Sequence, residues 1–326
     1  MTAAAMRNDP IHVSLAVNQD FELPLTVALT SLALAHRPGE CQVSVVHNGF
    51  TSKARDRIGQ GVNGHLDIEW IPIDERILSG AHAPAFLTKA SLYRLLLPQI
   101  LRERDRTIYL DADLVVLESL RCLWDVDLGE HVLGAVRDAA SPWAAGTHGT
   151  NWHEVGIAPD SPYFNSGVLL LPLELWRRQQ LTESALAVLR RVKTRWGDQC
   201  AINLVAEGRW LELPRRWNVQ TADVDRRGLG WALWRESVED ALAHPAILHF
   251  NERSKPWTLG ATHPLAETWF QFLDHTALAG WRPRPGKTIA ERAERWVRRV
   301  RASARSVPDL TPAQWNPAVG DVGRER

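Results

Sequence analysis

The sequence predicts an α/β fold in which a mainly parallel β-sheet carries helices on both faces. Strand-like and helix-like segments alternate through the N-terminal half, which is typical of parallel sheets because consecutive parallel strands need a crossover connection. With 326 residues, of which 45% are hydrophobic, the chain can bury a sizeable core in one large domain or two small ones. Such sheets bind ligands where their strands end, so we expect the functional residues there.

The individual elements follow from local patterns. Residues 23–36 are apolar at helical spacing, and Pro38-Gly39 ends that helix. A helix at residues 87–97 should stop at Pro98, because proline cannot continue a helix without losing a hydrogen bond. In chain order we expect a strand at 11–17, a helix at 23–36, a strand at 42–47, a helix at 53–60, a strand at 66–73, a helix at 87–97, and strands at 106–110 and 131–136.

Overall composition excludes some classes of protein. The 38 Lys and Arg residues balance the 38 Asp and Glu residues, so we expect no nucleic-acid partner. Cys41, Cys122 and Cys200 are far apart and odd in number, which indicates a reduced, intracellular protein. We see neither a secretory signal pattern nor an apolar run of about 18 residues, and therefore expect a soluble, cytoplasmic protein.

The C-terminal segment differs from the rest. We expect residues 1–280 to form the main domain, and residues 281–326 to form a basic amphipathic helix followed, from Ser306, by a poorly ordered tail. Nine Arg or Lys residues face two Glu residues between Trp281 and Arg305. Apolar residues recur there at helical spacing: Ile289, Ala293, Trp296, Val297 and Val300.

A basic helix with a Trp on its apolar side can lie in a membrane interface, and the alternative is a helix packed on the main domain with a solvated basic face. On the first interpretation, residues 287–305 give peripheral contact with the inner face of the membrane. We predict salt-sensitive binding to anionic vesicles, because each Arg near an anionic surface contributes about 1 kcal/mol. Truncation after Gly280 should abolish it, and equal binding by truncated and full-length protein would instead indicate a soluble acceptor.

Two carboxylates, Asp111 and Asp113, follow the apolar run Thr107-Ile-Tyr-Leu. If the strand continues through them, both side chains point the same way, roughly 6.5–7 Å apart along the chain. Unpaired carboxylates at the tip of a buried strand are costly to desolvate, so a cation should meet them. A divalent metal that carries a diphosphate fits, since hard cations take carboxylate oxygens and keep positions open for phosphate oxygens. A solvated Asp-turn is the alternative for this motif alone.

Three further motifs carry polar groups at element ends. Asn165-Ser-Gly interrupts an apolar strand, as happens where a ligand approaches closely. Asp198-Gln199 follows a Gly, with Asp198 in a helix N-cap position, and an ordinary cap is the alternative. His249 ends a short apolar run, and Lys255-Pro-Trp follows six residues later; a satisfied core histidine is the alternative for His249.

Two other features precede or separate these motifs. Arg94 lies on the expected helix before the Asp-x-Asp strand. Residues 139–161 are rich in Ala, Ser, Gly, Pro and His without a clear period, which predicts a long surface loop. Trp143, His148 and Trp152 in this loop either stack on an acceptor sugar or cover the core.

Taken in order, these segments resemble glycosyltransferase family 8, which includes bacterial lipopolysaccharide sugar transferases, glycogenin and plant galactinol synthases. The order and spacing of the motifs match from about residue 11 to residue 257. The resemblance implies a GT-A type, Rossmann-like fold. It also implies a retaining transferase that moves a hexose from a UDP-sugar, with Mn²⁺ as the metal and Mg²⁺ as an alternative.

The resemblance also assigns roles to individual residues. Two carboxylates and one imidazole suit Mn²⁺ better than Mg²⁺, because nitrogen is a softer ligand than oxygen. By the matching motifs, the expected metal ligands are Asp111, Asp113 and His249. The donor is expected to contact Ala112, Arg94 and Lys255, with Lys255 on its diphosphate. The transferred sugar is expected among Asn165, Asp198 and Gln199, and the base at Ala16, Asn18 and Asp20.

Two departures from the family pattern matter. Cys200 stands where the family usually has a second Asp, which leaves the donor sugar and any nucleophile open. Asn18 stands where an Asp is common, although its amide oxygen can still accept from the imide N–H of uracil.

The residues expected to carry catalysis are Arg94, Asn165, Asp198 and Gln199. Retention needs either a double displacement, for which Asp198 is the best local carboxylate, or attack on the face that the diphosphate leaves. Gln199 is a poor nucleophile, so we favour front-face attack, with Asn165 or Gln199 stabilising the oxocarbenium-like centre.

The acceptor is expected to be a glycan, a lipid-linked saccharide or a small molecule. Self-glucosylation is disfavoured because Tyr93, Tyr109 and Tyr163 all lie inside motif segments. The alternative functions are a metal-dependent sugar-nucleotide hydrolase or nucleotidyltransferase, and a non-catalytic sugar-nucleotide-binding protein.

Overall fold

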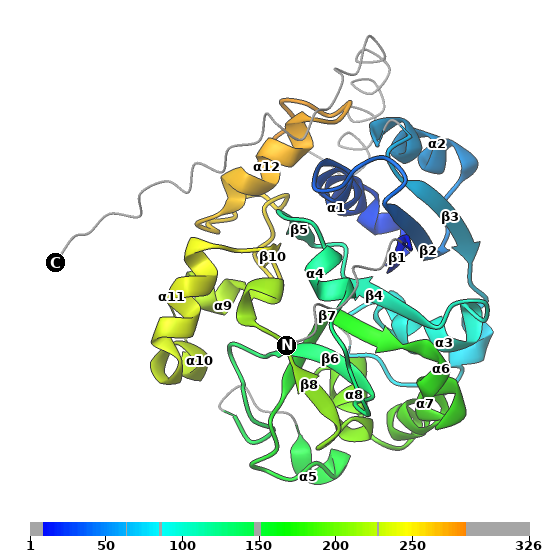
Figure 1. The fold of residues 1–326 in the computed structure, drawn as a ribbon, viewed down its shortest axis with the longest axis vertical. Coiled ribbons are helices and arrows are strands. Elements are labelled where there is room, and N and C mark those ends of the chain that lie inside the picture. The colour runs from blue at the N-terminus through cyan, green and yellow to red at the C-terminus, as the bar shows by residue number, and fades with distance from the viewer. Residues whose placement is uncertain (1–8, 63, 85–86, 147–150, 227, 285–326) are drawn as a thin grey trace, which may run out of the picture.

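The computed structural model describes residues 9–62, 64–84, 87–146, 151–226 and 228–284. A seven-stranded sheet forms its centre, with strand order β3-β2-β1-β4-β7-β6-β8 (Figure 1). The predicted α/β class with a mixed, mainly parallel sheet is confirmed. In chain order these strands are β1 Ile11–Asn18, β2 Cys41–Asn48, β3 Asp67–Pro72, β4 Arg106–Leu110, β6 Leu133–Arg137, β7 Phe164–Pro172 and β8 Trp210–Glu212.

Helices surround this sheet, and short 3₁₀ turns connect several elements. The α-helices are α1 Glu22–Leu34, α2 Ser52–Gly61, α3 Leu97–Ile100, α4 Arg121–Trp124, α5 Trp152–Val155, α6 Leu173–Arg178, α7 Leu181–Arg191, α8 Asp198–Val205, α9 Thr221–Val224, α10 Gly228–Leu233, α11 Arg235–Ala243 and α12 Ala266–Asp274. The 3₁₀ helices are η1 Gln19–Phe21, η2 Glu75–Leu78, η3 Lys89–Leu96 and η4 Arg215–Asn218.

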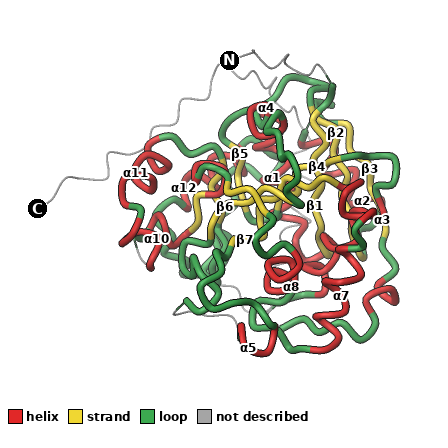
Figure 2. The backbone as a smooth tube through the Cα atoms, turned by 60° about the horizontal axis from the view of Figure 1, so that its bottom comes forward, coloured by secondary structure: helices red, strands yellow, loops and turns green. Residues whose placement is uncertain are grey.

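The sheet separates two hydrophobic cores. One core packs α1, α2 and α4 against side chains such as Leu15 and Val45, while the other packs η3, α6, α7 and α8 against side chains such as Tyr109 and Leu169. Figure 2 shows the strands running through the middle of the molecule, with α7 and α8 on one side and α4 on the other. Because helices cover both faces of the sheet, the strands have nearly continuous apolar sequences.

Strand β7 is the reversed strand of the large sheet. It runs antiparallel to both β4 and β6, whereas the pairs β1–β2, β2–β3, β1–β4 and β6–β8 are parallel. Because of this reversal, the N-terminal end of β7 lies at the same edge as the C-terminal ends of β4 and β6. The polar Asn165-Ser-Gly at the start of β7 is thereby placed beside Asp111, whose backbone N–H donates to the carbonyl of Gly167 at 2.8 Å.

A second, smaller sheet adjoins this edge and was not predicted from the sequence. It has the order β5-β10-β9, with β5 at Leu114–Val116, β10 at Ile247–His249 and β9 at Val219–Gln220. Strand β5 starts immediately after Asp113 and pairs antiparallel with β10, so that His249 lies opposite Leu114. The pairing brings the last residue of β10 to the Asp-x-Asp turn.

Two local predictions were wrong. The segment expected to be an α-helix at 87–97 forms the 3₁₀ helix η3. Pro98 does not end a helix but lies in the first turn of α3. Proline is tolerated there because an N–H in the first turn has no intrahelical acceptor. The strand β4 ends at Leu110, so Asp111 and Asp113 lie in the turn between β4 and β5 and do not follow strand alternation.

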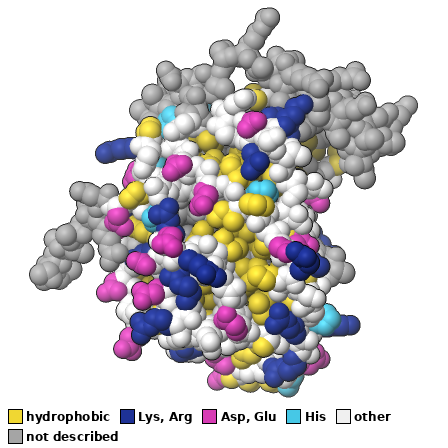
Figure 3. Space-filling model, turned by 90° about the vertical axis from the view of Figure 1, so that its right-hand side faces the viewer, with side chains coloured by type: hydrophobic (Ala, Val, Ile, Leu, Met, Phe, Trp, Pro, Cys, Tyr) yellow, Lys and Arg dark blue, Asp and Glu magenta, His cyan; other side chains and the backbone are white. Residues whose placement is uncertain are grey.

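Several expectations fall outside the described residues. The basic helix at 287–304, its proposed membrane contact and the tail from Ser306 lie there, and the domain boundary after residue 280 stays a prediction. Among the described residues, no helix is both long enough and apolar enough to cross a membrane. On the face seen from the right of Figure 1, charges of both signs are mixed around a central band of apolar side chains (Figure 3), in keeping with the formal neutrality of the chain.

Candidate active site

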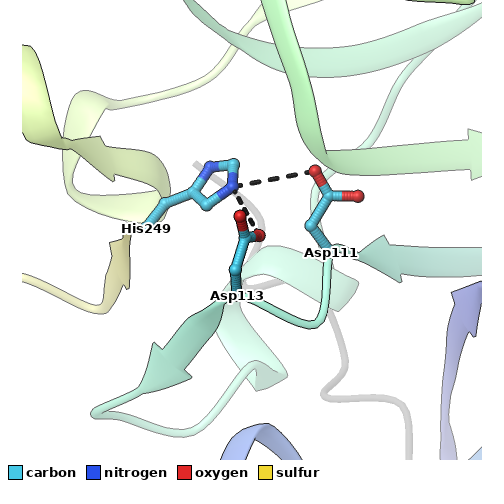
Figure 4. A group of neighbouring side chains, drawn as sticks. All are labelled: Asp111, Asp113 and His249. Atoms are coloured by element: carbon cyan, nitrogen blue, oxygen red, sulfur yellow. Dashed lines mark hydrogen bonds and ion pairs between the residues drawn. The ribbon is translucent and has the colours of Figure 1, made fainter. Parts of the chain in front are cut away.

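Three potential metal ligands meet at the turn after β4. Asp111 and Asp113 come from this turn, and His249 reaches them from the end of β10 (Figure 4). The ring Nε2 of His249 lies 3.1 Å from Oδ1 of Asp113 and 3.7 Å from Oδ2 of Asp111. In the part of the chain that the structure describes, their ligand atoms all lie within 4.8 Å of one another. We call these three residues the metal triad.

The backbone around the triad is fixed by hydrogen bonds and by one glycine. The N–H of Phe250 donates to the carbonyl of Asp113 at 2.9 Å, which ties β10 to the turn. A Cβ on Gly167 would lie 2.1 Å from Cε1 of His249 and 2.9 Å from Oδ2 of Asp111. A glycine is therefore required here for close approach, as expected for a Gly within a strand.

The carboxylates of the triad have protein cations as partners, which corrects the expectation that they are unpaired. Arg94 lies 3.1 Å from Oδ1 of Asp111, and Nζ of Lys255 lies 2.6 Å from Oδ2 of Asp113. Burial by itself would raise the pKa of Asp113, but the Lys255 ammonium beside it holds that pKa well below its ordinary value. Asp113 therefore stays ionised, and Lys255 is fixed beside the triad.

Arg94 connects the triad with the start of α8. Its guanidinium is 7% exposed, and its Nε lies 2.8 Å from Oδ2 of Asp198. Asp198 is the first residue of α8, not its N-cap, and Gly197 occupies the N-cap position with a φ of 60°. Burial raises the pKa of Asp198 to about 6, against the opposing effect of Arg94. The expected N-cap position of Asp198 and the alternative of an ordinary cap are both wrong, and the carboxylate is the ionic partner of Arg94.

Asn165 and Gln199 form an amide cluster beside the triad. The N–H of Gly167 donates to Oδ1 of Asn165 at 3.0 Å, and the N–H of Ser166 donates to Oε1 of Gln199 at 3.1 Å. Both side-chain NH₂ groups lie 3.4–3.5 Å from Oδ2 of Asp138. The structure thus brings together the residues expected around the transferred sugar.

Asp138 joins this cluster although the sequence analysis did not select it. It follows β6 directly, is 8% exposed, and accepts backbone N–H groups from Ala140 and Ser141 at 3.0 and 2.8 Å. Burial raises the pKa of Asp138. The available signal was its position after an expected strand, the same position that Asp111 occupies after β4.

The expected base-binding segment lies at the same edge of the sheet. Ala16 and Asn18 are among the last three residues of strand β1, and Asp20 is exposed in η1. The Oδ1 atom of Asn18 is buried and makes no hydrogen bond to a described residue. These positions are compatible with a base at the end of β1, and their roles stay predictions.

Cys200 does not enter the amide cluster. Its side chain is fully buried, and the Tyr163 hydroxyl lies 3.3 Å from its Sγ. Burial raises the pKa of the Cys200 thiol to about 11, so it is not a thiolate near neutral pH.

The long loop at 139–161 contains two tryptophans with different surroundings. Trp143 packs against Trp234 with ring centroids 5.5 Å apart, while Trp152 is partly buried against the core that contains α8. His148 lies outside the described residues, and the acceptor role of this loop stays a prediction.

Comparison with known proteins decides the family. The family model described as Glycosyl transferase family 8 matches residues 12–260, which is most of the chain. The chain is a member of glycosyltransferase family 8. The match covers the metal triad, Arg94, Lys255 and the amide cluster, so the resemblance inferred from the motifs is confirmed. The protein is an enzyme, and specifically a hexosyltransferase of this family.

Curated relatives agree with this assignment. The chain is 28% identical over 281 residues to General stress protein A of Bacillus subtilis (strain 168), covering 83% of this chain and 96% of that protein. It is 24% identical over 294 residues to the lipopolysaccharide 1,2-glucosyltransferase of Escherichia coli (strain K12), covering 88% and 84%. With glycosyltransferase GlyB of Streptococcus pneumoniae serotype 4 (strain ATCC BAA-334 / TIGR4) it shares 28% identity over 204 residues, and spans 46% of that longer protein.

Solved structures establish the fold. The galactosyltransferase LgtC, crystallised with donor and acceptor sugar analogs, matches with a TM-score of 0.72 at 23% identity, covering 89% of this chain and 100% of that one. The apo structure of the bifunctional glycosyltransferase WbbM matches with a TM-score of 0.67 at 18% identity, covering 84% and 51%. The predicted GT-A type fold is confirmed.

Proposed function

We propose that this transferase moves a hexose from a UDP-sugar to an acceptor hydroxyl with retention at the anomeric carbon, using a divalent metal held by Asp111, Asp113 and His249. The observation that carries the proposal is the convergence of two carboxylates and one ring nitrogen on a single point beside Lys255 and Arg94. Mn²⁺ is our first choice of metal and Mg²⁺ the second, because imidazole nitrogen favours the softer ion.

The donor atoms of the triad fit one divalent ion. Metal–ligand bonds of roughly 2.0–2.4 Å place two ligands of one ion no more than about 4.8 Å apart, the bound within which the three ligand atoms lie. The distances of 3.1 and 3.7 Å from Nε2 of His249 to the two carboxylates lie inside this limit. When bound, the metal supplies a Lewis acid for the departing diphosphate.

The charges around the triad suit a metal together with a diphosphate. Arg94 and Lys255 face three carboxylates, those of Asp111, Asp113 and Asp198, so a divalent cation alone would still leave the site with a net positive charge. The diphosphate of a sugar nucleotide carries the compensating negative charge. We therefore expect the metal and the donor to bind cooperatively, with Lys255 and Arg94 as fixed cations at the phosphates.

The transferred sugar is assigned to the amide cluster. Asn165, Gln199 and Asp138 present acceptors and donors at the edge of the sheet, and Asp198 is bound to Arg94. These groups can hold sugar hydroxyls in fixed orientations. The base of the nucleotide is assigned to Ala16, Asn18 and Asp20, where Oδ1 of Asn18 can accept from the imide N–H of uracil.

Retention of configuration at the anomeric carbon is explained by attack of the acceptor hydroxyl on the same face that the diphosphate leaves. A double displacement needs a free nucleophile at the anomeric carbon. Asp198 is 2% exposed and paired with Arg94, and Cys200 is buried with a raised pKa, so neither is a free nucleophile. The departing phosphate then takes the proton of the acceptor hydroxyl, while Asn165 or Gln199 stabilises the oxocarbenium-like centre.

The acceptor is proposed to be a glycan or a lipid-linked saccharide, and the lipopolysaccharide 1,2-glucosyltransferase among the relatives supports this choice. A small-molecule acceptor remains the alternative. A cytoplasmic location, with peripheral membrane contact through residues 287–305, would give access to a lipid-linked acceptor.

The deciding experiment measures UDP release from a panel of UDP-sugars, with and without Mn²⁺ and with and without acceptors. A transferase should release UDP and label the acceptor only when metal and acceptor are both present. Equal turnover without acceptor would indicate a hydrolase. Donor binding without turnover across the acceptor panel would indicate a sugar-nucleotide-binding protein.

Replacing Lys255 by Ala should lower kcat by about 10²–10³-fold, the range found for a single preorganised electrostatic group. Its ammonium is held 2.6 Å from Asp113 and 2.5 Å from the carbonyl of Phe250, so it is in place before the donor's negative charge develops. Binding of free UDP should weaken much less. Lys53→Ala, on the exposed side of α2, is the matched control. An effect confined to KM would mean that Lys255 binds donor and transition state equally.

A further inference from the structure

The ring of His249 is oriented by a residue that carries no motif in the sequence. Its Nδ1 lies 3.0 Å from Oδ1 of Asn218, at the end of η4. Asn218 is fully buried and immediately precedes β9, which pairs with β10 so that Val219 lies opposite Leu248. The small sheet therefore places the Asn218 amide behind the ring, on the side away from the two carboxylates.

A chain of hydrogen bonds fixes which nitrogen of His249 carries the proton. The N–H of Gly167 donates to Oδ1 of Asn165, which must therefore act as an acceptor. The NH₂ group of Asn218 donates to that same oxygen at 2.9 Å, so the amide of Asn218 turns its oxygen toward His249. An amide oxygen cannot donate, so Nδ1 of His249 must supply the proton.

A histidine that ligates a metal carries its one proton on the other ring nitrogen, so a proton at Nδ1 leaves Nε2 as the ligand atom. That nitrogen is the one that faces Asp113 and Asp111, at 3.1 and 3.7 Å. A lone pair directed at two carboxylates is favourable only where a cation lies between them. The hydrogen bonds that begin at a backbone N–H of β7 thus prepare His249 for metal ligation.

We propose that Asn218 is the positioning residue for the metal triad: it holds His249 in the tautomer that binds the metal through Nε2 and connects it with Asn165 in the sugar-binding cluster. The proposal rests on the metal site proposed above. A group that accepts a hydrogen bond from a ligating histidine orients the ring and increases its basicity, and its loss commonly lowers metal affinity by about 10–100-fold.

The same bonds couple the two halves of the site. Oδ1 of Asn165 accepts from both Gly167 and Asn218, and its NH₂ group lies 3.4 Å from Oε1 of Gln199. A change at Asn218 therefore reaches the metal ligand on one side and the amides assigned to the sugar on the other. Because Asn165, Asn218 and His249 are buried, water cannot readily replace a lost partner.

The test measures the Mn²⁺ affinity of the full chain by titration, first alone and then with saturating UDP, and in both cases without acceptor. Asn218→Leu removes both hydrogen bonds at similar volume and should weaken Mn²⁺ binding about 10–100-fold. Asn218→Asp keeps an acceptor for Nδ1–H in either protonation state, so its Mn²⁺ affinity should stay within about threefold of the wild type.

The matched control is Asn203→Leu. Asn203 is 3% exposed and bonds only to backbone groups, those of Phe164 and Gln199, so its loss should lower thermal stability without changing Mn²⁺ affinity. Equal Mn²⁺ affinity of wild type and Asn218→Leu would overturn the role of Asn218. Absence of Mn²⁺ binding in the wild type, with saturating UDP as well as without it, would overturn the proposed metal site itself.

A measurement on the wild-type protein does not depend on any variant folding. In the Zn²⁺-loaded protein, ¹H–¹⁵N correlation spectra should show His249 protonated at Nδ1, with the metal on Nε2. A proton on Nε2, or metal ligation through Nδ1, would refute the proposed hydrogen-bond chain.

Discussion

Replacing Asp113 by Asn should abolish metal-dependent sugar transfer, with a fall in kcat/KM of about 10²–10⁴-fold, because a Lewis acid contributes several kcal/mol to this type of reaction. The amide keeps the volume of the carboxyl group but removes the charge that faces Nε2 of His249 at 3.1 Å. The chain should remain folded, since Lys255 can still donate to the amide oxygen and to the carbonyl of Phe250.

The measurement compares turnover of wild type and Asp113→Asn across a Mn²⁺ titration, with unfolding followed separately. Asp56→Asn, on the exposed face of α2, is the matched charge-removing control and should retain native turnover. If Asp113→Asn kept near-native turnover that chelators do not reduce, the assignment of the triad as a metal site would be wrong.

Replacing Gly167 by Ala should be nearly as damaging to Mn²⁺ binding and turnover, although no catalytic group is removed. The added methyl group would lie 2.1 Å from Cε1 and 2.7 Å from Nδ1 of His249, so the ring must leave its position. We expect a loss of turnover of about 10²-fold or more, and a loss of stability of about 1–3 kcal/mol from overpacking.

The control for this substitution is Gly59→Ala in α2, where a Cβ meets nothing within 4 Å. It should raise stability by up to about 1 kcal/mol, because Ala is the better helix former, and should leave turnover unchanged. Native Mn²⁺ affinity in Gly167→Ala would show that His249 need not occupy this position, and would therefore count against its role as a metal ligand.

Most of the site could be predicted from the sequence because its residues lie at the ends of apolar runs. Asp111, Asn165 and His249 each interrupt or end such a run, and polar groups in those places are costly unless they serve a ligand or a partner. No single motif specifies a transferase, and it was the order and spacing of all the motifs together that indicated the family. Arg94 was predicted correctly to lie close to the triad, but its ion pair with Asp198 was not foreseen.

Other contacts could not be predicted because nothing local determines them. Asn218 lies in a stretch of Arg, Trp and Asn residues without periodicity, and its partner His249 is 31 residues away. The N-cap position expected of Asp198 was wrong because Gly197 adopts a positive φ and takes that position, so the Asp198 carboxylate pairs with Arg94. Strand alternation failed at Asp113 because β4 ends at Leu110, three residues before Asp113.

The sequence by itself determined the alternation of strands and helices in the N-terminal half, the class of sheet and the residue types available for chemistry, because these depend on local apolar periodicity and on where polar residues interrupt it. Only the tertiary structure decided which of those residues meet. The reversal of β7 brings Asn165 and Gly167 to the ends of β4 and β6, and the β5–β10 pairing brings His249 to Asp113, 136 residues away in the chain. Such contacts arise from strand pairing between distant segments, which buries apolar surface that no local pattern can assign to a partner.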